Sequence, residues 1–486
     1  MSNDPLADGK SDEPVTEKLT QDEFEQRLAA VYRRQVPDFV ELVSVDRLSG
    51  GASQETYRIV LRADSGEITQ AMRRSPGGLH SEPAPGHPGL PTEARLMQCA
   101  DDAGIPAPTV FYVLQASDGL GDGFIMQWLE GEALGARIVR SDKYESLRER
   151  LAYEIGKVVA KIHAIDLDAT GLRDKLDVMS PGFFVQQTWD RYKLMQTPQP
   201  MIDYVGCWLM NNLPEIYSPQ LVHNDFRNGN FMVSANEIIA VLDWEIAHIG
   251  DPMRDLGWIC VNSWRFGSNK PVGGFGEYED LFRGYEEVSG QKVDPEAVRF
   301  WEVFGSFWWS VGCLGFAEQY RIGPDKSAER AAIGRRNSEC LVDCVNLLFP
   351  GDVKLIPAEE NSDNLDVPGA DKLLESVRDF LREEVMPSTQ GRTNFLSRVA
   401  SNSLDVVLRE WQTGAEAKRL ELARLQAFYG SNASLAELRW KLVNSLRDGT
   451  QALDDQDLQS HLRQTVVNQI AIDQPRYSGF KTAIGV

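Results

Sequence analysis

The stretch that decides the fold is LVHNDFRNGNFMVSANEIIAVLDWEIAHIGDPMRD, residues 221–255. It carries four polar residues in a fixed order: His223, Asp225, Asn230 and Asp243. Two short apolar runs, residues 231–233 and 238–242, flank the polar sequence Ser-Ala-Asn-Glu and predict a β-hairpin. Such a hairpin brings its two ends together, so we expect Asn230 and Asp243 to lie close to one another.

These residue types suit the chemistry of phosphoryl transfer. A phosphoryl group in transfer carries spread negative charge, which Mg²⁺ neutralises when hard oxygen ligands hold the ion in place. Asn230 and Asp243 offer such oxygens, and Asp225, on the loop before the hairpin, is placed to accept a proton from an attacking hydroxyl. Taken singly, an Asn- and Gly-rich turn or an aspartate at a strand end is an ordinary surface feature. The complete set with its following strand favours a phosphoryl-transfer site.

The sequences HNDFRNGNFMV and VLDWEIAHIGDPMRDLGW closely resemble the aminoglycoside-phosphotransferase-like kinases. Within that family they are most similar to the branch related to kinase domains fused to some acyl-CoA dehydrogenases. The resemblance covers about residues 20–350 and is much less specific for the substrate than for the family. It implies an α+β, two-lobed, protein-kinase-like fold that binds ATP and Mg²⁺ between its lobes.

The resemblance also implies roles for the residues of the stretch. Asp225 is then the catalytic residue, and His223 holds the loop that carries it. Asn230 and Asp243 are the metal ligands. The acidic turn with Asp251 and Asp255 would buttress this loop, although either residue could instead cap a helix.

The nucleotide-binding residues are expected in the N-terminal part of the chain. Two adjacent glycines precede an alternating run at Tyr57, Ile59 and Leu61, which predicts a hairpin whose tip lets backbone N–H groups approach phosphates. An ordinary hairpin gives the same pattern. By position in the family, the residues of this turn that lie over the phosphates are Gly50, Gly51, Ala52 and Ser53.

A predicted strand over residues 68–72 ends at two arginines. Kinases place a cation here that holds the α- and β-phosphates and pairs with an acid on the next helix. By resemblance that cation is Arg73, with Arg74 as the alternative, and Glu93 is the acidic partner. Thr92 is the predicted cap of the helix that carries Glu93.

A further apolar strand, residues 124–129, leads into Glu130-Gly131-Glu132. In kinase-like folds the backbone that follows such a strand binds the adenine. The resemblance therefore points to Gln127, Trp128 and Leu129, whose backbone donors leave no signature in the sequence.

Length and composition limit the classes of function. The chain has 486 residues and a net charge of −22, which argues against non-specific binding of nucleic acid or of an anionic membrane surface. The six cysteines show no zinc-type spacing, and the acidic start contains no apolar segment typical of a signal peptide. The longest uncharged run, residues 303–317, is short for a membrane span and fits a buried helix. A cytoplasmic protein with reduced thiols is expected.

The chain divides into five predicted segments. They are a disordered tail (1–18), an N-terminal nucleotide-binding lobe (19–129), a C-terminal catalytic lobe (130–349), a linker (350–369) and a helical domain (370–486). The linker is acidic and contains three prolines. Helices are expected at about 371–384, 394–413, 415–428, 434–449 and 458–473, and none in the final QPRYSGF. This last part resembles a helical domain of unknown function and is interpreted as an interaction or homo-oligomerisation module.

Three functions compete on the sequence alone. The first is a kinase for a small-molecule hydroxyl, such as a hydroxyacyl-CoA, with an acyl-CoA dehydrogenase-type partner in the same pathway. A basic edge at Arg137, Arg140, Lys143, Arg148 and Arg150 would suit a CoA ester, although it also fits a charged helix surface. The second is an aminoglycoside kinase. The third is a non-catalytic nucleotide-binding scaffold, against which the intact catalytic set weighs. The glycine-rich segment 263–278 is a candidate substrate lid or a simple connection.

Overall fold

The computed structural model describes residues 19–48, 54–80, 83–215, 217–323, 326–358 and 367–486. The chain forms two compact units. The first comprises residues up to 102 together with 107–130, and the second comprises 103–106 and 131–486. The predicted tail (1–18) and the predicted phosphate-binding turn (50–53) lie outside the described residues.

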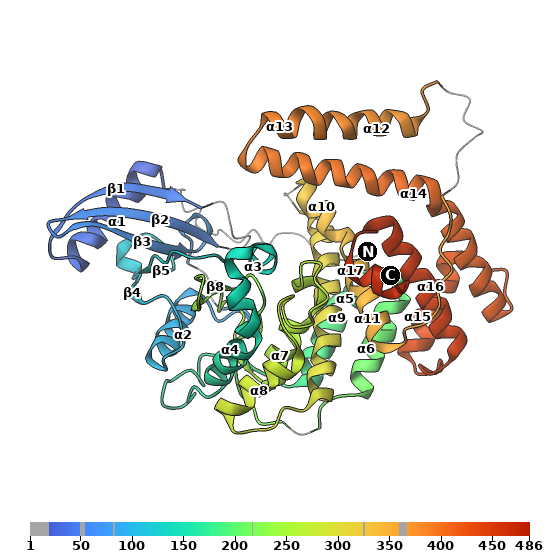
Figure 1. The fold of residues 1–486 in the computed structure, drawn as a ribbon, viewed down its shortest axis with the longest axis horizontal. Coiled ribbons are helices and arrows are strands. Elements are labelled where there is room, and N and C mark those ends of the chain that lie inside the picture. Colours follow the sequence, from blue (N-terminus) through green and yellow to red (C-terminus); the bar gives the residue numbers. More distant parts are fainter. Residues whose placement is uncertain (1–18, 49–53, 81–82, 216, 324–325, 359–366) are drawn as a thin grey trace, which may run out of the picture. The chain divides into compact units, whose positions relative to one another are not determined.

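The first unit is built on a five-stranded antiparallel sheet with the strand order β1-β2-β3-β5-β4 (Figure 1). The strands are β1 (Phe39–Arg47), β2 (Glu55–Ala63), β3 (Gly66–Arg74), β4 (Val110–Val113) and β5 (Gly123–Gln127). Tyr57, Ile59 and Leu61 of β2 are buried as their alternation predicts, and they share a core with Met72 and Ile125.

Two helices complete this unit. Helix α1 (Gln21–Gln35) begins with a capping box between Thr20 and Glu23 and adds its apolar face to the core of the sheet. Helix α2 (Leu90–Asp102) carries Glu93. Thr92 was predicted to cap α2, and this is wrong because the helix begins two residues earlier, so that Thr92 lies inside its first turn.

The second unit begins with the segment 131–349, called the large lobe below. Its helices are α3 (Gly135–Arg140), α4 (Glu145–His163), α5 (Pro181–Leu194), α6 (Pro200–Asn211), α7 (Met253–Cys260), α8 (Tyr278–Ser289), α9 (Pro295–Ile322), α10 (Ala328–Arg335) and α11 (Asn337–Leu348). Its strands are β6 (Val178–Met179), β7 (Gln220–Val222), β8 (Phe231–Val233), β9 (Ile238–Val241) and β10 (His248–Gly250). The predicted hairpin is formed by β8 and β9. Strand β10 pairs with β7, which leads into the loop that carries Asp225.

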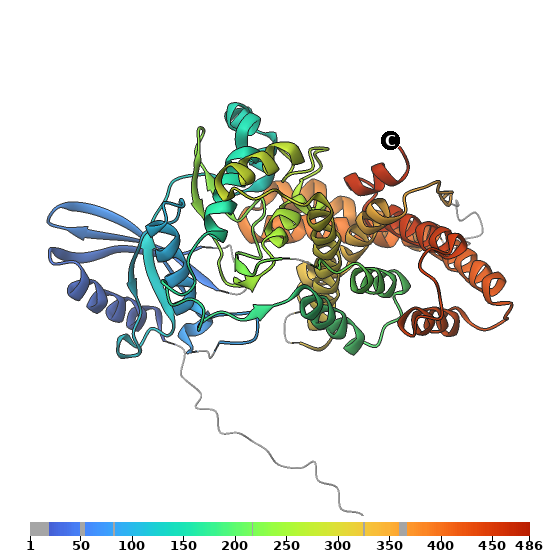
Figure 2. The ribbon, with the colours of Figure 1, turned by 90° about the horizontal axis from the view of Figure 1, so that it is seen from below.

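The end of the second unit is helical (Figures 1 and 2). These elements, called the C-terminal module below, are α12 (Ala370–Phe380), α13 (Met386–Ser388), α14 (Gly391–Tyr429), α15 (Leu435–Arg447), α16 (Gln456–Asp473) and α17 (Ser478–Ala483). Two helices were predicted where the structure has the single helix α14, since Gly414 is buried and the flanking helix formers outweigh its low propensity. The final segment was predicted to lack a helix, and α17 corrects this.

The C-terminal module and the large lobe share one hydrophobic core. Leu425, Leu438, Leu442 and Val467 of the module belong to the same buried cluster as Phe304 of α9. The predicted linker also contacts the module, because the backbone N–H groups of Lys354 and Ile356 donate to the side chains of Gln464 and Asn468. The module is therefore packed on the large lobe as part of one compact unit.

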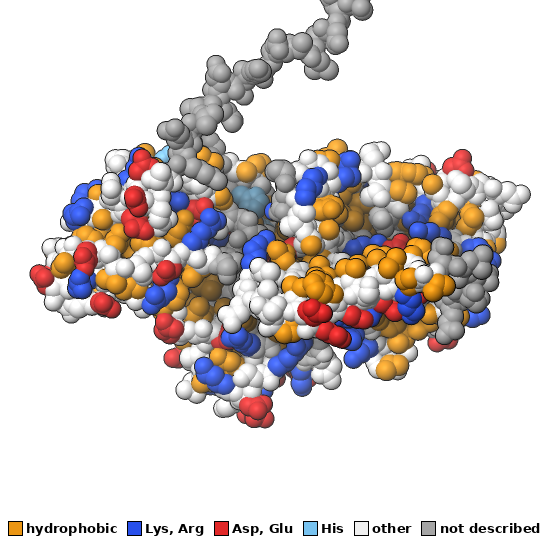
Figure 3. Space-filling view, turned by 90° about the horizontal axis from the view of Figure 1, so that it is seen from above, with side chains coloured by type: hydrophobic (Ala, Val, Ile, Leu, Met, Phe, Trp, Pro, Cys, Tyr) orange, Lys and Arg blue, Asp and Glu red, His pale blue; other side chains and the backbone are white. Residues whose placement is uncertain are grey.

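Helix α12 keeps an apolar row on the surface. Leu373, Val377 and Phe380 are each about half exposed, and Figure 3 shows hydrophobic side chains gathered along this face of the module. No helix among the described residues is long and apolar enough to cross a membrane. The six cysteines are free thiols, as predicted.

Candidate active site

Asp225 lies in a loop between β7 and β8, residues 223–230, called the catalytic loop below. Its Oδ1 accepts a hydrogen bond from the indole Nε1 of Trp258 at 2.8 Å and from Nε of Arg227 at 3.1 Å. Its Oδ2 is bonded by the side-chain amide of Asn230. Burial raises the pKa of the Asp225 carboxyl, while Arg227 opposes this rise and the neighbouring charge of Asp243 adds to it. Helix α7 and the loop itself thus fix the orientation of this carboxylate.

The fully buried carboxylate of Asp255 supports the backbone of the catalytic loop. Asp255 of α7 accepts the backbone N–H groups of His223 at 2.8 Å and of Asn224 at 2.7 Å. Its Oδ2 also lies 3.0 Å from Nε2 of His163 on α4, whose Nδ1 is 3.0 Å from the Tyr285 hydroxyl. Burial alone would raise the pKa of Asp255, yet the bonds from His163 and the loop hold it below its usual value. Asp255 therefore supports the catalytic loop, as the resemblance implied.

His223 connects the catalytic loop to the end of the hairpin. Its Nδ1 accepts the Asp225 backbone N–H at 3.3 Å, and its Nε2 lies 3.0 Å from the Leu242 carbonyl oxygen. One nitrogen accepts and the other donates, which is the arrangement of a neutral imidazole. Burial lowers the pKa of His223, which favours the same neutral form. The buried ring therefore joins the backbone of Asp225 to that of Leu242.

A buried arginine contacts the same loop. Nε of Arg254 donates to Oδ1 of Asn224 at 3.0 Å, and its guanidinium lies 4.6 Å from the ring centroid of Trp258. Asn224 has a left-handed φ of 68°, an uncommon conformation that this bond helps to hold. Burial lowers the pKa of Arg254 to about 9, so the group remains charged at pH 7.

The predicted metal ligands lie at the two ends of the hairpin. The Leu242 N–H donates to the Asn230 carbonyl at 2.8 Å, and this backbone hydrogen bond joins the two ends of the hairpin. Asp243 is the residue that follows Leu242. The Asn230 amide nitrogen donates to the Asp225 carbonyl at 3.0 Å, which leaves the amide oxygen for a cation. Asp243 has a left-handed φ of 67°, a strained conformation of the kind that clusters at ligand sites.

These two oxygen-bearing side chains fit the needs of Mg²⁺. The ion is commonly held by one or two protein oxygens together with phosphate oxygens and water. Among the residues that the structure describes, no group of three or more His, Cys, Asp and Glu side chains forms a metal cluster. The assignment of Asn230 and Asp243 as ligands stays a prediction.

The first unit contains the predicted pair of arginine and glutamate. Arg73, near the end of β3, forms an ion pair of 2.9 Å with Glu93 of α2, and the Glu93 side chain is almost fully buried. Arg74 points into a different environment, where it pairs with Glu55 at 2.8 Å and lies 4.2 Å from the ring centroid of Phe24. Of the two arginines, Arg73 has the position predicted for the phosphate-binding cation.

The predicted adenine-binding segment lies at the end of β5. The Gln127 N–H donates to the Thr109 carbonyl at 2.8 Å, so this donor is already used within the sheet. Trp128 and Leu129 follow the strand and remain the candidates for binding a base. The Trp128 indole is oriented by a bond of 2.6 Å to Glu130 and by the Arg58 guanidinium, 5.5 Å from its ring centroid.

The candidate lid is packed against the large lobe. Residues 272–276 are buried, and the Asn228 side chain of the catalytic loop donates to the Gly273 carbonyl at 2.7 Å. This part of the segment therefore supports the catalytic loop through Asn228, and its role as a substrate lid or a simple connection stays a prediction.

Sequence reasoning missed three residues of the site: Arg227, Arg254 and Trp258. The last two stand on α7 beside Asp255, in the sequence GDPMRDLGW that carried part of the resemblance. Helical spacing places Trp258 one turn after Arg254 and on the same face, which is the signal that could have found the pair. Their contacts with the catalytic loop depend on tertiary structure.

The fold and the site together define a protein-kinase-like phosphotransferase. The model of the phosphotransferase enzyme family matches residues 44–301, about half of the chain, and the chain belongs to this family. A second family model, a domain of unknown function called DUF6285, matches residues 387–477 within the C-terminal module.

The chain is also similar to individual curated proteins and to a solved structure. The chain is 31% identical to mouse acyl-CoA dehydrogenase family member 10 over 51% of this chain and 22% of the relative. It is 26% identical to human acyl-CoA dehydrogenase family member 11 over 52% of this chain and 32% of the relative. The chain thus spans less than a third of the length of these curated relatives. A crystal structure from Ralstonia eutropha, assigned to the aminoglycoside phosphotransferases, superposes with a TM-score of 0.53 at 23% identity and covers 65% of this chain and 95% of that one. This similarity supports the two-lobed α+β fold.

Proposed function

We propose that the protein transfers the γ-phosphate of ATP, with Mg²⁺, to a hydroxyl group of a small molecule. The observation that supports this most directly is the arrangement around Asp225. Trp258 and Arg227 hold one carboxylate oxygen, Asn230 contacts the other, and Asp255 fixes the loop from behind. A base held so rigidly beside a candidate metal ligand suits phosphoryl transfer, which depends on positioning and charge stabilisation.

Each residue has a defined part in this reaction. Asp225 orients the acceptor hydroxyl and takes its proton, and His223 keeps the loop in place without contacting the substrate. Asn230 and Asp243 would hold Mg²⁺, and Arg73, paired with Glu93, would bind phosphate oxygens. ATP with its bound metal supplies the phosphoryl group and the charge neutralisation that the transfer requires.

A hydroxyacyl-CoA is the acceptor that we propose within this class. The names of the curated relatives support a link to acyl-CoA metabolism, and an acyl-CoA dehydrogenase-type enzyme is the corresponding pathway partner. The basic edge gives little further support, because Arg140 donates to the Phe266 carbonyl and Arg148 to the carbonyls of Ile138 and Ser141. These contacts already use two of the five cations of this edge within the large lobe.

Two other functions remain as outcomes of a test. An aminoglycoside kinase would phosphorylate cationic drugs, and a nucleotide-binding scaffold would bind ATP without transfer.

A cytoplasmic location and the absence of membrane or nucleic-acid partners stay predictions from composition. Homo-oligomerisation also stays a prediction, for which the exposed row on α12 is the natural place to test. Replacing Val377 and Phe380 by lysine should lower the molar mass measured by light scattering if the row is buried between copies.

The deciding experiment is an acceptor screen. Purified protein is incubated with ATP and Mg²⁺ against hydroxyacyl-CoA thioesters, free hydroxy acids and aminoglycosides, and mass spectrometry detects the gain of one phosphate. Asp225→Asn should abolish transfer, whereas Asp168→Asn, a change at an exposed aspartate, should not. Phosphorylation of an aminoglycoside alone would replace the proposed acceptor. Full turnover by Asp225→Asn would contradict the mechanism.

A further inference from the structure

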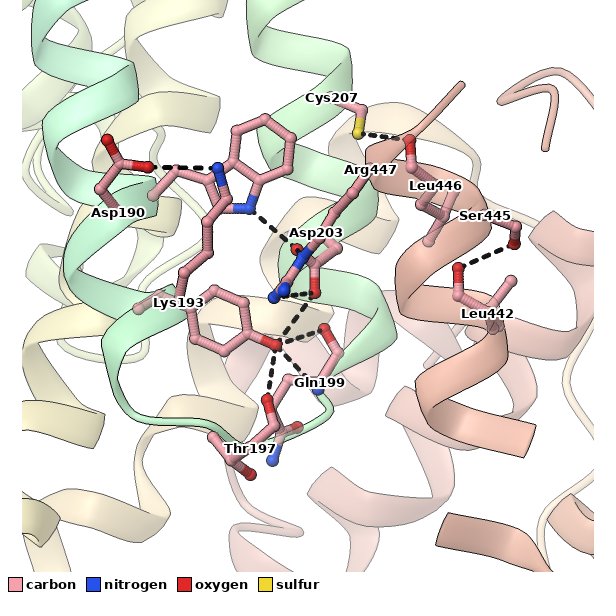
Figure 4. A network of polar contacts seen from close by, with 12 residues as sticks. Asp190, Lys193, Thr197, Gln199, Asp203, Cys207, Leu442, Ser445, Leu446 and Arg447 are labelled. Atoms are coloured by element: carbon pink, nitrogen blue, oxygen red, sulfur yellow. Dashed lines mark hydrogen bonds and ion pairs between the residues drawn. The ribbon is translucent and has the colours of Figure 1, made fainter. Parts of the chain in front are cut away.

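The C-terminal module is attached to the large lobe by buried polar contacts as well as by the shared core. Asp203 of α6 is fully buried, and Arg447 at the end of α15 donates to it from Nε at 2.7 Å (Figure 4). Trp189 Nε1 at 2.9 Å and the Tyr192 hydroxyl at 3.0 Å complete the surroundings of this carboxylate. The module thus supplies the cation for a buried charge of the large lobe, so its position on the lobe is specific.

A second set of contacts lies at the end of the module, next to α17. The Tyr477 hydroxyl donates to Oδ2 of Asp343 on α11 at 2.6 Å. Oδ1 of the same carboxylate accepts from the Asn262 side chain at 2.8 Å, and the Ser478 hydroxyl donates to Oδ1 of Asn262 at 2.9 Å. Gly479 is packed so closely that an added Cβ would lie 2.4 Å from Asp343. Ser478 therefore contacts Asn262 directly, and Tyr477 contacts it indirectly, since both Tyr477 and Asn262 donate to Asp343.

Asn262 connects this set to the active site. It stands two residues beyond the end of α7, the helix whose Trp258 bonds the Asp225 carboxylate and whose Asp255 holds the catalytic loop. The path from the Tyr477 hydroxyl to the Asp225 carboxylate runs through hydrogen bonds to Asp343 and Asn262, then along the backbone of residues 261–262 into α7, and ends at the Trp258 bond. A shift of α7 would move Trp258, which bonds the Asp225 carboxylate, and Asp255, which holds the backbone of the catalytic loop.

We propose that residues 477–479 are positioning residues of the kinase, and that the C-terminal module serves as a built-in support for the catalytic loop. The inference rests on the proposed function, since it assigns the module's role to the reaction at Asp225. The proposal assigns the C-terminal module a binding partner within the same protein, namely Asn262 in the segment that follows α7. Loss of this support displaces Trp258 and Asp255 and lowers the rate of the chemical step.

The test compares two tyrosines that bridge the same two parts of the chain. Tyr477→Phe removes the hydroxyl that supports Asn262 through Asp343. Tyr204→Phe is the matched control, because its hydroxyl donates from α6 to the Leu453 carbonyl of the module at 3.0 Å and accepts from the Gln459 side chain of α16 at 3.3 Å. Loss of the 2.6 Å hydrogen bond to Asp343 is expected to lower kcat of Tyr477→Phe about tenfold, with KM for ATP changed less than about twofold. Tyr204→Phe should keep the kcat of the unaltered protein at temperatures below its unfolding transition.

Hydrogen exchange provides a readout that does not require an acceptor. Backbone amides of residues 223–230 and 253–262 should exchange faster in Tyr477→Phe than in Tyr204→Phe, even if no acceptor is phosphorylated. This separates failure of the proposed function from failure of the inference. Ser478→Ala should show a smaller change of the same kind. Equal exchange and equal kcat in the two tyrosine variants would overturn the proposal.

Discussion

The buried ion pair between the C-terminal module and the large lobe allows a quantitative test. Replacing Arg447 with methionine keeps most of the aliphatic bulk of the side chain but removes the cation that faces Asp203. The Asp203 side chain is fully buried, and it keeps only the donors of Trp189 and Tyr192. An uncompensated carboxylate therefore remains inside the protein.

The magnitude follows from the cost of such a charge. Removal of one partner from a buried ion pair destabilises a protein by about 3–5 kcal/mol, and the two remaining donors favour the lower end. The entropy of unfolding scales with the number of residues, so each kcal/mol lowers the Tm of a unit this large by about 1–2 °C. Arg447→Met should therefore lower the Tm by about 3–8 °C.

A double-mutant cycle identifies the charge as the cause. In Asp203→Asn/Arg447→Met the buried group is neutral, so thermal denaturation followed by circular dichroism should show recovery of more than half of the loss. Arg419→Met is the control, because Arg419 is exposed and pairs with Glu416 on the same helix, where such pairs contribute little. A Tm of Arg447→Met equal to that of the control, or no recovery in the double variant, would refute this account of the interface.

Three further predictions concern the nucleotide, the metal and pH. Arg73→Met should raise KM for ATP at least about tenfold, since it removes the phosphate-binding cation, whereas Arg74→Met should mainly lower the Tm; the reverse pattern in steady-state kinetics and melting would exchange their roles. Asp243→Asn should raise the Mg²⁺ concentration needed for half-maximal turnover at least about tenfold, measured by titrating the metal at fixed ATP, and an unchanged titration would remove Asp243 from the metal site. Burial raises the pKa of Asp343 from 3.8 to about 7, although Tyr477 and Asn262 donate to it and Arg265 also lowers it. The folded state then binds the proton more tightly, so this group's contribution to stability is present below pH 4 and is lost as the pH rises through 7. Denaturant unfolding between pH 4 and 8 should show a flatter profile for Asp343→Asn, and identical profiles would contradict the raised pKa.

Much of the catalytic loop was predictable because its pattern is local. The spacing of His223, Asp225 and Asn230, and the apolar runs of β8 and β9, need only nearby residues to define a turn and a hairpin. The alternation along β2 was predictable for the same reason. The family membership and the α+β fold that followed from these motifs are confirmed. The roles of individual site residues and the acceptor stay predictions.

The sequence by itself determined which residue types meet at the catalytic loop, because the short-range geometry of strands, turns and helices is set by neighbouring side chains. Only the tertiary structure decided what holds that loop. Trp258 bonds Asp225 across 33 positions, and Arg447 reaches Asp203 across 244, distances in the chain over which no periodicity carries a signal. The same holds for Tyr477, which reaches Asp343 across 134 positions. Such contacts form only when burial makes distant groups meet, and a buried charge or hydroxyl then requires its partner.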